Sequence, residues 1–250
     1  MGHEVRDDQL LRERILAEND VAGGEPWEVI AKVLAERYSC RGYLPDPVPH
    51  KTIQRILSLA QLSASWCNAQ PWQTIVTEGE GTERFRRELY AYADANRDSK
   101  IEADFDFPAQ YTGVYNIRRR ETAWQLYDCV GVTFGDRTAS RQQTLENYRL
   151  FGAPHALLIT TNTDLGVYGA IDCGIYVSSL LTLMQSMGVA SIPQAAFAIF
   201  SPFIKEYFGL PEDRRVVCGI SFGYADPSHP ANGFRTRRAP QAEVATFVTE

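Results

Sequence analysis

The chain has 250 residues, of which 44% are hydrophobic and 22% are charged, and its formal net charge is -6. This length predicts one substantial domain or at most two small ones. The negative charge argues against a general nucleic-acid binder, which needs a basic face, and no apolar run approaches the roughly 20 residues that span a bilayer. Five scattered cysteines without a CxxC pair, and a charged N-terminus without an apolar signal segment, indicate a cytoplasmic enzyme with no metal site and no membrane anchor.

Residues 1–25 are polar and end in Gly23-Gly24, so we expect an N-terminal arm ahead of one domain over residues 26–250. Apolar periodicity predicts amphipathic helices around Trp27 and around Ile53. The elements predicted next, in chain order, are a strand at Trp72–Val76, a helix over Glu83–Arg97, helices around Thr122–Val130 and Arg141–Arg149, and a strand at Ala156–Thr161.

Residues 98–120 are aromatic and irregular, which is typical of a lid or insertion that covers a site. The longest apolar segment, Gly174–Met187, is too short to cross a membrane, so we expect a helix buried on nearly all sides. Val216–Phe222 is a second buried strand, and residues 224–250 form a C-terminal extension. Helices and strands without regular βαβ alternation favour an α+β fold with a sheet between helices.

The common nucleotide-binding and hydrolase motifs, such as GxGxxG, a Walker loop or GxSxG, are absent from the sequence. Polar side chains gather instead in three separated segments. In the first, Arg37, Ser39 and Arg41 follow a helix, and two guanidinium forks with a hydroxyl suit a phosphate. A solvated helix end, where the dipole favours basic residues, is the alternative.

The second segment, residues 63–72, joins a helix to a strand. Its small residues allow close approach to a flat ligand, while Ser65 and Asn68 offer hydrogen bonds to ring heteroatoms. An ordinary polar loop anchored by a tryptophan is the alternative. The third segment, residues 232–238, is again cationic with a hydroxyl, and a solvated basic tail would explain it equally well.

Together the segments resemble the nitroreductase superfamily over almost the whole chain from about residue 26. Arg37, Ser39 and Arg41 match the family's Arg-x-Ser-x-Arg/Lys segment, which binds the FMN phosphate and ribityl chain, and Tyr38 lies among them. Residues 64–72 match the Pro-Ser-x-x-Asn-x-Gln-Pro-Trp loop that lies along the flavin. The flavin contacts that this match implies are Ala64, which replaces the usual proline, and Ser65, Trp66 and Asn68.

The resemblance also implies a short loop whose backbone N–H donates to flavin N5. Ala195 is the best match for this donor, and the neighbouring positions expected at the flavin are Pro193, Gln194 and Ala196.

The family's C-terminal phosphate clamp corresponds to Arg235 and Arg238, with Arg237 left open. Arg149 is a weaker match for the residue at the flavin pyrimidine edge.

Within the superfamily the chain resembles the nitrobenzoate-reductase-like branch, partly through its aromatic insertion. The implied activity is FMN-dependent reduction of nitroaromatic compounds by ping-pong hydride transfer, with NAD(P)H as the electron donor. Flavin N5 carries the hydride, so no side chain is assigned as a catalytic acid or base. The residues expected to face a small aromatic substrate are Tyr111, Tyr115 and Arg118, although the Arg118–Arg120 run suits a charged surface helix equally well.

The resemblance further implies a three-layer sandwich, with a central, mostly antiparallel sheet flanked by helices, in an intertwined homodimer that exchanges terminal arms. Three alternatives stay open: another FMN reaction on this fold, such as dehalogenation, enone reduction or dehydrogenation; a flavin store or sensor; and a homologue without flavin. Cys67, beside the flavin loop, is either a reactive thiol or an ordinary buried cysteine, and His155 suits a structural role better than a catalytic one.

Overall fold

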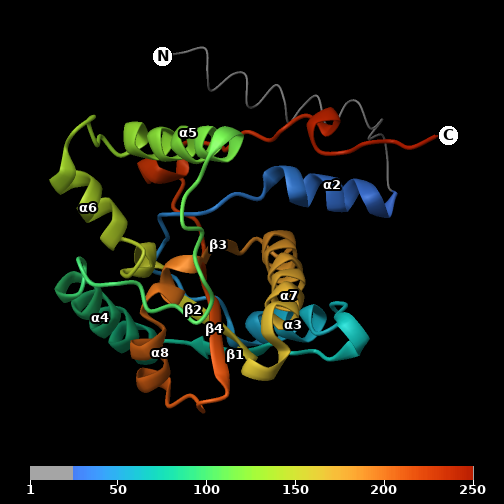
Figure 1. Cartoon of the computed structure of the whole chain (residues 1–250), viewed down its shortest axis with the longest axis horizontal. Helices are drawn as coiled ribbons and strands as arrows, with labels where there is room; N and C mark the ends of the chain where they lie inside the picture. The colour runs from blue at the N-terminus through green and yellow to red at the C-terminus, as the bar shows by residue number, and fades with distance from the viewer. Residues whose placement is uncertain (1–24, 250) are drawn as a thin grey trace.

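The computed structural model describes residues 25–249 (Figure 1), so the predicted N-terminal arm lies almost wholly outside the described residues. The described part of the chain forms one antiparallel sheet with strand order β1-β2-β4-β3. Its strands are β1 (Gln73–Thr77), β2 (His155–Asn162), β3 (Ala190–Gln194) and β4 (Arg214–Gly223). The predicted α+β fold with an antiparallel sheet is therefore confirmed.

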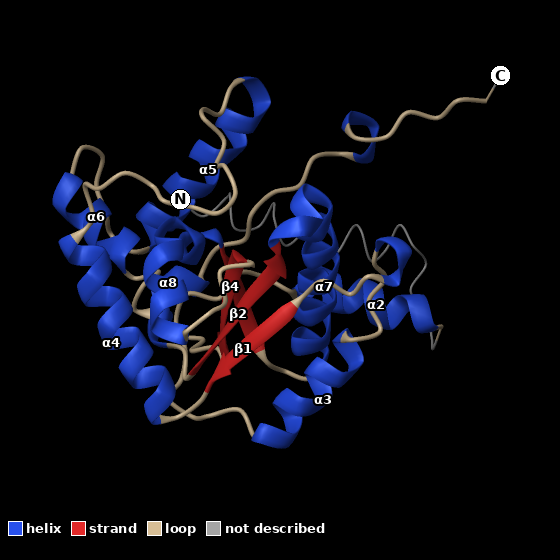
Figure 2. Ribbon diagram, turned by 60° about the horizontal axis from the view of Figure 1, so that its bottom comes forward, coloured by secondary structure: helices blue, strands red, loops and turns tan. Residues whose placement is uncertain are grey.

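Helices cover both faces of this sheet, as the turned view in Figure 2 shows. On one face lie α3 (His50–Ala60) and α7 (Gly166–Ser186), and on the other lie α4 (Glu80–Ala95) and α8 (Ser201–Phe208). In β2, Leu157 and Ile159 belong to the first core, while Ala156 and Leu158 belong to the second. This alternation is the period of two that a strand buried on both faces requires.

The elements that project from the sandwich are α2 (Pro26–Glu36), α5 (Gly113–Cys129) and α6 (Arg137–Leu145). The helix predicted from Thr122 begins nine residues earlier, so only residues 98–112 of the expected irregular stretch lack a helix. The helix predicted from Arg141 begins at Arg137, because Asp136 caps it by accepting the Ala139 N–H.

Two elements were missing from the prediction. The resemblance implied a short loop around Pro193, but residues 190–194 form β3, an edge strand that tolerates a residue without an N–H. Helix α8 went unnoticed because it is short, although Pro202 lies in its first turn and Gly209 ends it in the left-handed conformation.

Helix α7 departs most from expectation. It is 21 residues long and packs against α2, α3, β2 and β3. Within the predicted segment, Gly174, Ile175, Ser178 and Ser186 are exposed, so the expectation of burial on nearly all sides was wrong for the single chain. Val167, Tyr168 and Ile171, which precede that segment in the helix, are exposed as well. The helix is long and apolar enough to span a membrane by length and composition, but its buried face packs on the sheet, as a core helix does.

His155 joins the start of β2 to two other segments. Its Nε2 accepts the Val48 N–H at 2.9 Å, its Nδ1 lies 3.3 Å from the Thr77 carbonyl oxygen, and its ring stacks on Phe222. These backbone contacts give His155 the structural role that the sequence favours.

Burial lowers the pKa of His155 below its ordinary value of 6.5. Between the lowered folded pKa and about 6.5, the unfolded chain therefore binds more protons than the folded chain. We expect the free energy of unfolding to fall as the pH drops below about 6.5, and this dependence to be weaker in His155→Gln. Urea unfolding between pH 5 and pH 8 measures it; an unchanged pH slope in the variant would show that another group is responsible.

Candidate functional site

The first predicted segment lies against the beginning of β3. Arg37 ends α2 in an extended conformation, and two residues later Ser39 forms a parallel bridge with Ser191. The Cys40 N–H donates to the Ser191 carbonyl at 3.2 Å. The backbone of Ser39 and Cys40 is thus fixed to the outer edge of β3.

Asn232 joins this segment to the C-terminal one. Its Oδ1 accepts the Arg41 N–H at 2.8 Å, and its Nδ2 donates to the carbonyl oxygens of Gly42 at 2.8 Å and Asp226 at 2.9 Å. A Cβ atom on Gly42 would lie 2.1 Å from the His229 ring, so only glycine allows the two segments to come this close. Two regions that are 191 residues apart in sequence therefore form one structure.

Four arginines gather at this junction. The Arg235 guanidinium lies 3.6 Å from the Tyr38 ring centroid, and that of Arg41 lies 5.7 Å from the Phe234 ring. Burial, followed by the charge of Arg238, lowers the pKa of Arg37, and burial lowers the pKa of Arg41. Burial therefore disfavours the charged forms of the Arg37 and Arg41 guanidinium groups.

Within residues 25–249, no carboxylate lies in ion-pair distance of Arg37, Arg41, Arg235 or Arg238. Arg237 differs, because its Nε lies 3.3 Å from Oε1 of Glu121. Among residues 25–249, Arg237 thus has a carboxylate partner, whereas Arg235 and Arg238 have none. A cluster of guanidinium groups that lacks an internal counter-charge suits a phosphate, so this donor set fits the FMN phosphate.

The second predicted segment is a loop around the short helix η1 (Trp66–Asn68). Cys67, Asn68 and Gln70 all have positive φ, at 50°, 55° and 47°. The Ser65 Oγ accepts the Gln70 N–H at 2.9 Å, which leaves the serine hydroxyl hydrogen available for a ligand. Trp66 and Cys67 are exposed, so the expectation of an ordinary buried cysteine at 67 was wrong.

Gln61, at the end of α3, holds the far side of this loop. Its Nε2 donates to Gln70 Oε1 at 2.8 Å, and its Oε1 accepts the Trp72 Nε1–H at 3.0 Å. The Trp72 ring in turn stacks on Tyr176 of α7, with centroids 4.7 Å apart. The Gln-Pro-Trp part of the motif therefore builds the loop and leaves Ser65 and Asn68 to meet a ligand.

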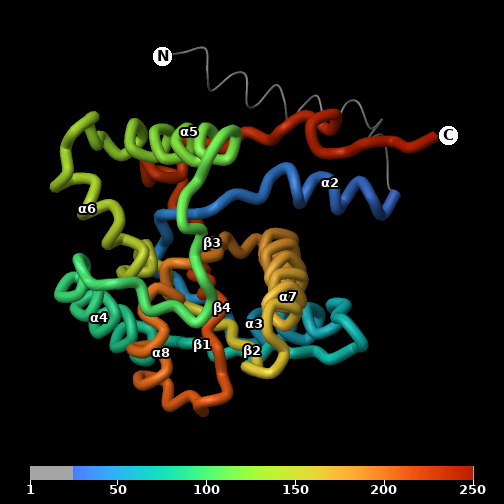
Figure 3. The backbone as a smooth tube through the Cα atoms, in the orientation of Figure 1, coloured from blue at the N-terminus to red at the C-terminus, as the bar shows by residue number. Residues whose placement is uncertain are grey.

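The loop and the arginine cluster lie at different ends of α7. The Trp66 N–H donates to Asp172 in the first half of that helix, whereas β3 follows its C-terminal end (Figure 3). The helix from residue 172 to its end rises by roughly 20 Å. A single chain thus brings the first and third segments together but leaves the second apart.

The predicted flavin N5 region is the junction of β3 and η4 (Ala195–Phe200). Pro193 and Ala195 are exposed there and Ala196 is half-buried, while the Gln194 side chain is buried against Ser221 and Asn147. Gln194 therefore supports the strand through its side chain. Because β3 is an edge strand bridged to Ser39, a flat ring along its outer edge would reach the arginine cluster.

The remaining predicted residues lie elsewhere. Arg149 is exposed over the Tyr90 ring, 4.6 Å from its centroid, and pairs with Glu146 at 3.7 Å, so the single chain does not bring it to the cluster. Tyr111 and Tyr115 are exposed at the N-terminal end of α5. Arg118 donates to Glu243 of the C-terminal extension at 2.9 Å, and this bond ties α5 to that extension.

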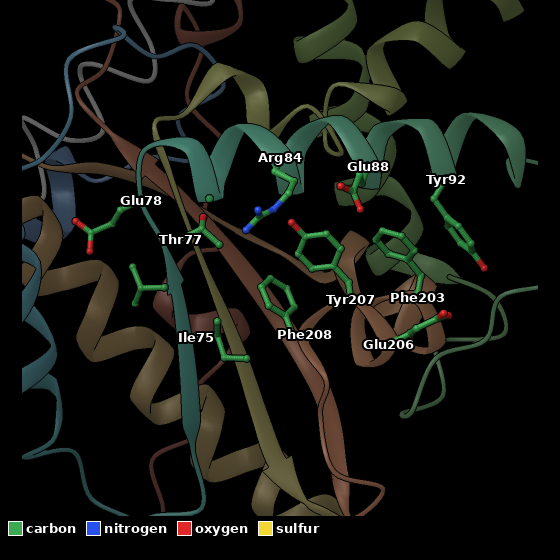
Figure 4. A pocket seen from close by; sticks show the side chains of 12 residues that line it. Ile75, Thr77, Glu78, Arg84, Glu88, Tyr92, Phe203, Glu206, Tyr207 and Phe208 are labelled. Atoms are coloured by element: carbon green, nitrogen blue, oxygen red, sulfur yellow. The ribbon is translucent and has the colours of Figure 1, made fainter.

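A cavity of about 890 Å³ lies away from these segments, between β1, α4 and α8 (Figure 4). Glu78, Glu88 and Glu206 line it beside the cation of Arg84. Three carboxylates would repel a phosphate, so this cavity does not fit the anionic end of FMN.

Sequence reasoning missed the contacts that organise the site. Asn232 stands in the third segment but was not singled out, because nothing in the sequence shows that it reaches Arg41. Gln61 and Asp172 lie outside the motifs altogether. Apart from the placement of Asp172 on an otherwise apolar helix face, the sequence carries no signal for them.

Comparison with known proteins agrees with this arrangement. The nitroreductase family profile matches residues 34–224. A nitroreductase, NfnB, from Mycolicibacterium smegmatis is 31% identical over 219 residues, covering 86% of this chain and 91% of that protein. A 4-nitrobenzoate reductase from a Nocardioides species is 30% identical over 225 residues, covering 88% and 90%.

The fold compares equally well with solved structures. The crystal structure of FMN-dependent NfnB from Mycobacterium smegmatis in complex with NADPH superposes with a TM-score of 0.84 at 29% identity, covering 90% of this chain and all of that one. The family match spans most of the chain and includes the first two segments of the site. The chain therefore belongs to the nitroreductase family.

Proposed function

We propose that this chain is an FMN-dependent NAD(P)H oxidoreductase that reduces nitroaromatic compounds. The observation that carries the proposal is the cluster of Arg37, Arg41, Arg235 and Arg238, which has no carboxylate partner among the described residues and lies beside the edge of β3 to which Ser39 is bridged. Relatives named as a nitroreductase and as 4-nitrobenzoate reductases, with identities near 30%, support the substrate class.

In this proposal the arginines and Ser39 hold the phosphate, and Tyr38 packs under Arg235. The ring lies along β3, with the Ala195 N–H directed at its N5 and with Pro193, Gln194 and Ala196 around it. Bound FMN would supply the hydride chemistry, which amino-acid side chains lack. The protein's part is to orient the ring and to place cations where negative charge develops.

Substrate residues are proposed on the elements that project from the sandwich. Tyr111 and Tyr115 present exposed rings to a small aromatic compound. Arg118 is bonded to the Glu243 carboxylate, so a substrate carboxylate such as that of nitrobenzoate would bind its guanidinium by replacing Glu243. Helix α5 has no buried residue in the single chain, as expected of an element that packs only in an assembly.

We also propose that the protein works in the cytoplasm as a homodimer with a flavin site shared between protomers. The apolar face of α7, formed by Val167, Tyr168, Ile171 and Ile175, is exposed in the single chain, and such a patch typically marks an interface. A two-fold axis near this face would bring Ser65 and Asn68 of one protomer to the arginine cluster of the other. Phe247 and Val248 of the C-terminal extension, 77% and 86% exposed, suit an exchanged arm.

The first prediction concerns the redox cycle. We expect the purified protein to be yellow, to bleach anaerobically with NADH or NADPH, and to regain its colour when 4-nitrobenzoate is added. Absorbance near the flavin maximum follows both steps. A colourless protein that takes up no FMN would refute the cofactor, and a protein that bleaches but ignores the nitro compound would refute the substrate class.

The second prediction concerns the phosphate. A hydrogen bond to a charged group contributes about 1.5–3 kcal/mol, so Arg37→Ala or Arg238→Ala should raise the FMN dissociation constant roughly ten- to hundredfold. Arg237→Ala is the matched control, because Arg237 pairs with Glu121 and its loss should leave affinity nearly unchanged. Quenching of flavin fluorescence measures all three. An equal effect of the Arg237 and Arg238 variants would contradict this assignment.

The third prediction concerns assembly. A carboxylate on the apolar face of α7, as in Ile171→Asp, should convert dimers to monomers and release FMN, since burying an unpaired charge is costly. Ile101→Asp makes the same change at an exposed position outside α7 and should leave the dimer intact. Size-exclusion chromatography with light scattering gives the mass. A wild-type monomer that retains FMN would overturn the shared site.

A further inference from the structure

The backbone of the flavin loop is strained at three of its residues. Cys67, Asn68 and Gln70 all adopt left-handed conformations with φ between 47° and 55°. Residues with a Cβ rarely adopt this conformation, and they persist in it only where surrounding contacts hold them. The loop therefore needs fixed anchors on both sides.

Two anchors hold Gln70: one lies inside the loop, and the other comes from the residue that directly follows α3. The Ser65 hydroxyl accepts the Gln70 N–H inside the loop, and Gln61 holds the Gln70 side chain. Neither of them holds Trp66, at the beginning of η1. The described anchor there comes from α7, where Oδ1 of Asp172 accepts the Trp66 N–H at 3.1 Å.

Asp172 is an unusual residue for its position. It is 5% exposed on the sheet-facing side of an apolar helix, and within residues 25–249 no cation lies within ion-pair distance of its carboxylate. Burying a carboxylate without a counter-ion is unfavourable. An apolar side chain at this position could not accept the Trp66 N–H, whereas the Asp172 carboxylate does.

The same helix also holds the Trp66 ring. Tyr168 lies one turn before Asp172, and its ring centroid is 4.6 Å from that of Trp66 at an interplanar angle of 50°. The indole is nevertheless 62% exposed, so one surface of it rests on Tyr168 and another stays open. Two residues of α7 thus fix both the backbone and the side chain at the start of the loop.

We infer that Asp172 is a positioning residue of the flavin site, which acts through the Trp66 N–H to hold Ser65 and Asn68 toward the cofactor and the indole toward the substrate. This inference rests on the proposed function. It assigns Asp172 no proton transfer, and its effect comes from the hydrogen bond that its side-chain oxygen accepts from the backbone of a strained loop.

Substitutions at this single position test the inference. Asp172→Ala removes the acceptor, and we expect the FMN dissociation constant and the KM for 4-nitrobenzoate each to rise roughly tenfold. At saturating FMN, kcat should change much less, because no group in the reaction is lost. Asp172→Asn keeps an acceptor oxygen in the same place and should stay within about threefold of wild type in both constants.

Asp172→Glu keeps the charge but displaces the oxygen by one methylene, so it should resemble Asp172→Ala. If the alanine variant does not fold, the contrast between asparagine and glutamate still decides the question. Wild-type values of both constants in Asp172→Ala, or equal effects of Asn and Glu, would overturn the inference. A wild-type protein that binds no FMN would instead refute the proposed function.

Discussion

Four arginines cannot be held together by their own charges, so the surrounding structure must hold them against mutual repulsion. Neutral hydrogen bonds do this: Asn232 accepts from the Arg41 backbone and donates to the Gly42 carbonyl, and Ser39 bridges to β3. Burial of Arg37 and Arg41 adds to the cost and appears as lowered pKa values. A bound dianion would relieve both the repulsion and the desolvation. In the proposed site, FMN would supply the negative charge that residues 25–249 do not place beside these arginines.

The sheet supplies the rigid support for this arrangement. Strands β2 and β4 are buried on both faces between two hydrophobic cores, which leaves β1 and β3 as the edges. Backbone groups at an edge can approach a flat ligand, whereas central strands are fully paired. Placing the arginine segment on the β3 edge thus combines cationic side chains with accessible backbone. The cavity beside β1 is lined by three glutamates and one arginine, so its charge suits an anionic cofactor less well than the arginine cluster does.

Local patterns in the sequence predicted what depends on local physics. The buried strands, the amphipathic helices and the three polar segments all follow from periodicity and side-chain chemistry. The prediction failed where tertiary context decides: residues 192–194, expected in a loop by resemblance, lie in an edge strand, and α7 is apolar all round yet buries one face. It also could not find Asn232, Gln61 or Asp172 as organising residues, because an amide or carboxylate looks the same in sequence whether it meets solvent or a backbone far along the chain.

One explanation accounts both for the exposed apolar face of α7 and for the distance between the flavin loop and the arginine cluster in the single chain. A helix that is apolar on both sides is stable in water only if both sides are covered, and the sheet covers one of them. The flavin loop is anchored to this same helix through Asp172 and Tyr168. In the proposed homodimer, the partner that covers the free face would also meet the loop, so assembly and completion of the site would be one event. Cofactor binding should then stabilise the assembly, because a ligand held by both protomers favours the state that contains them both.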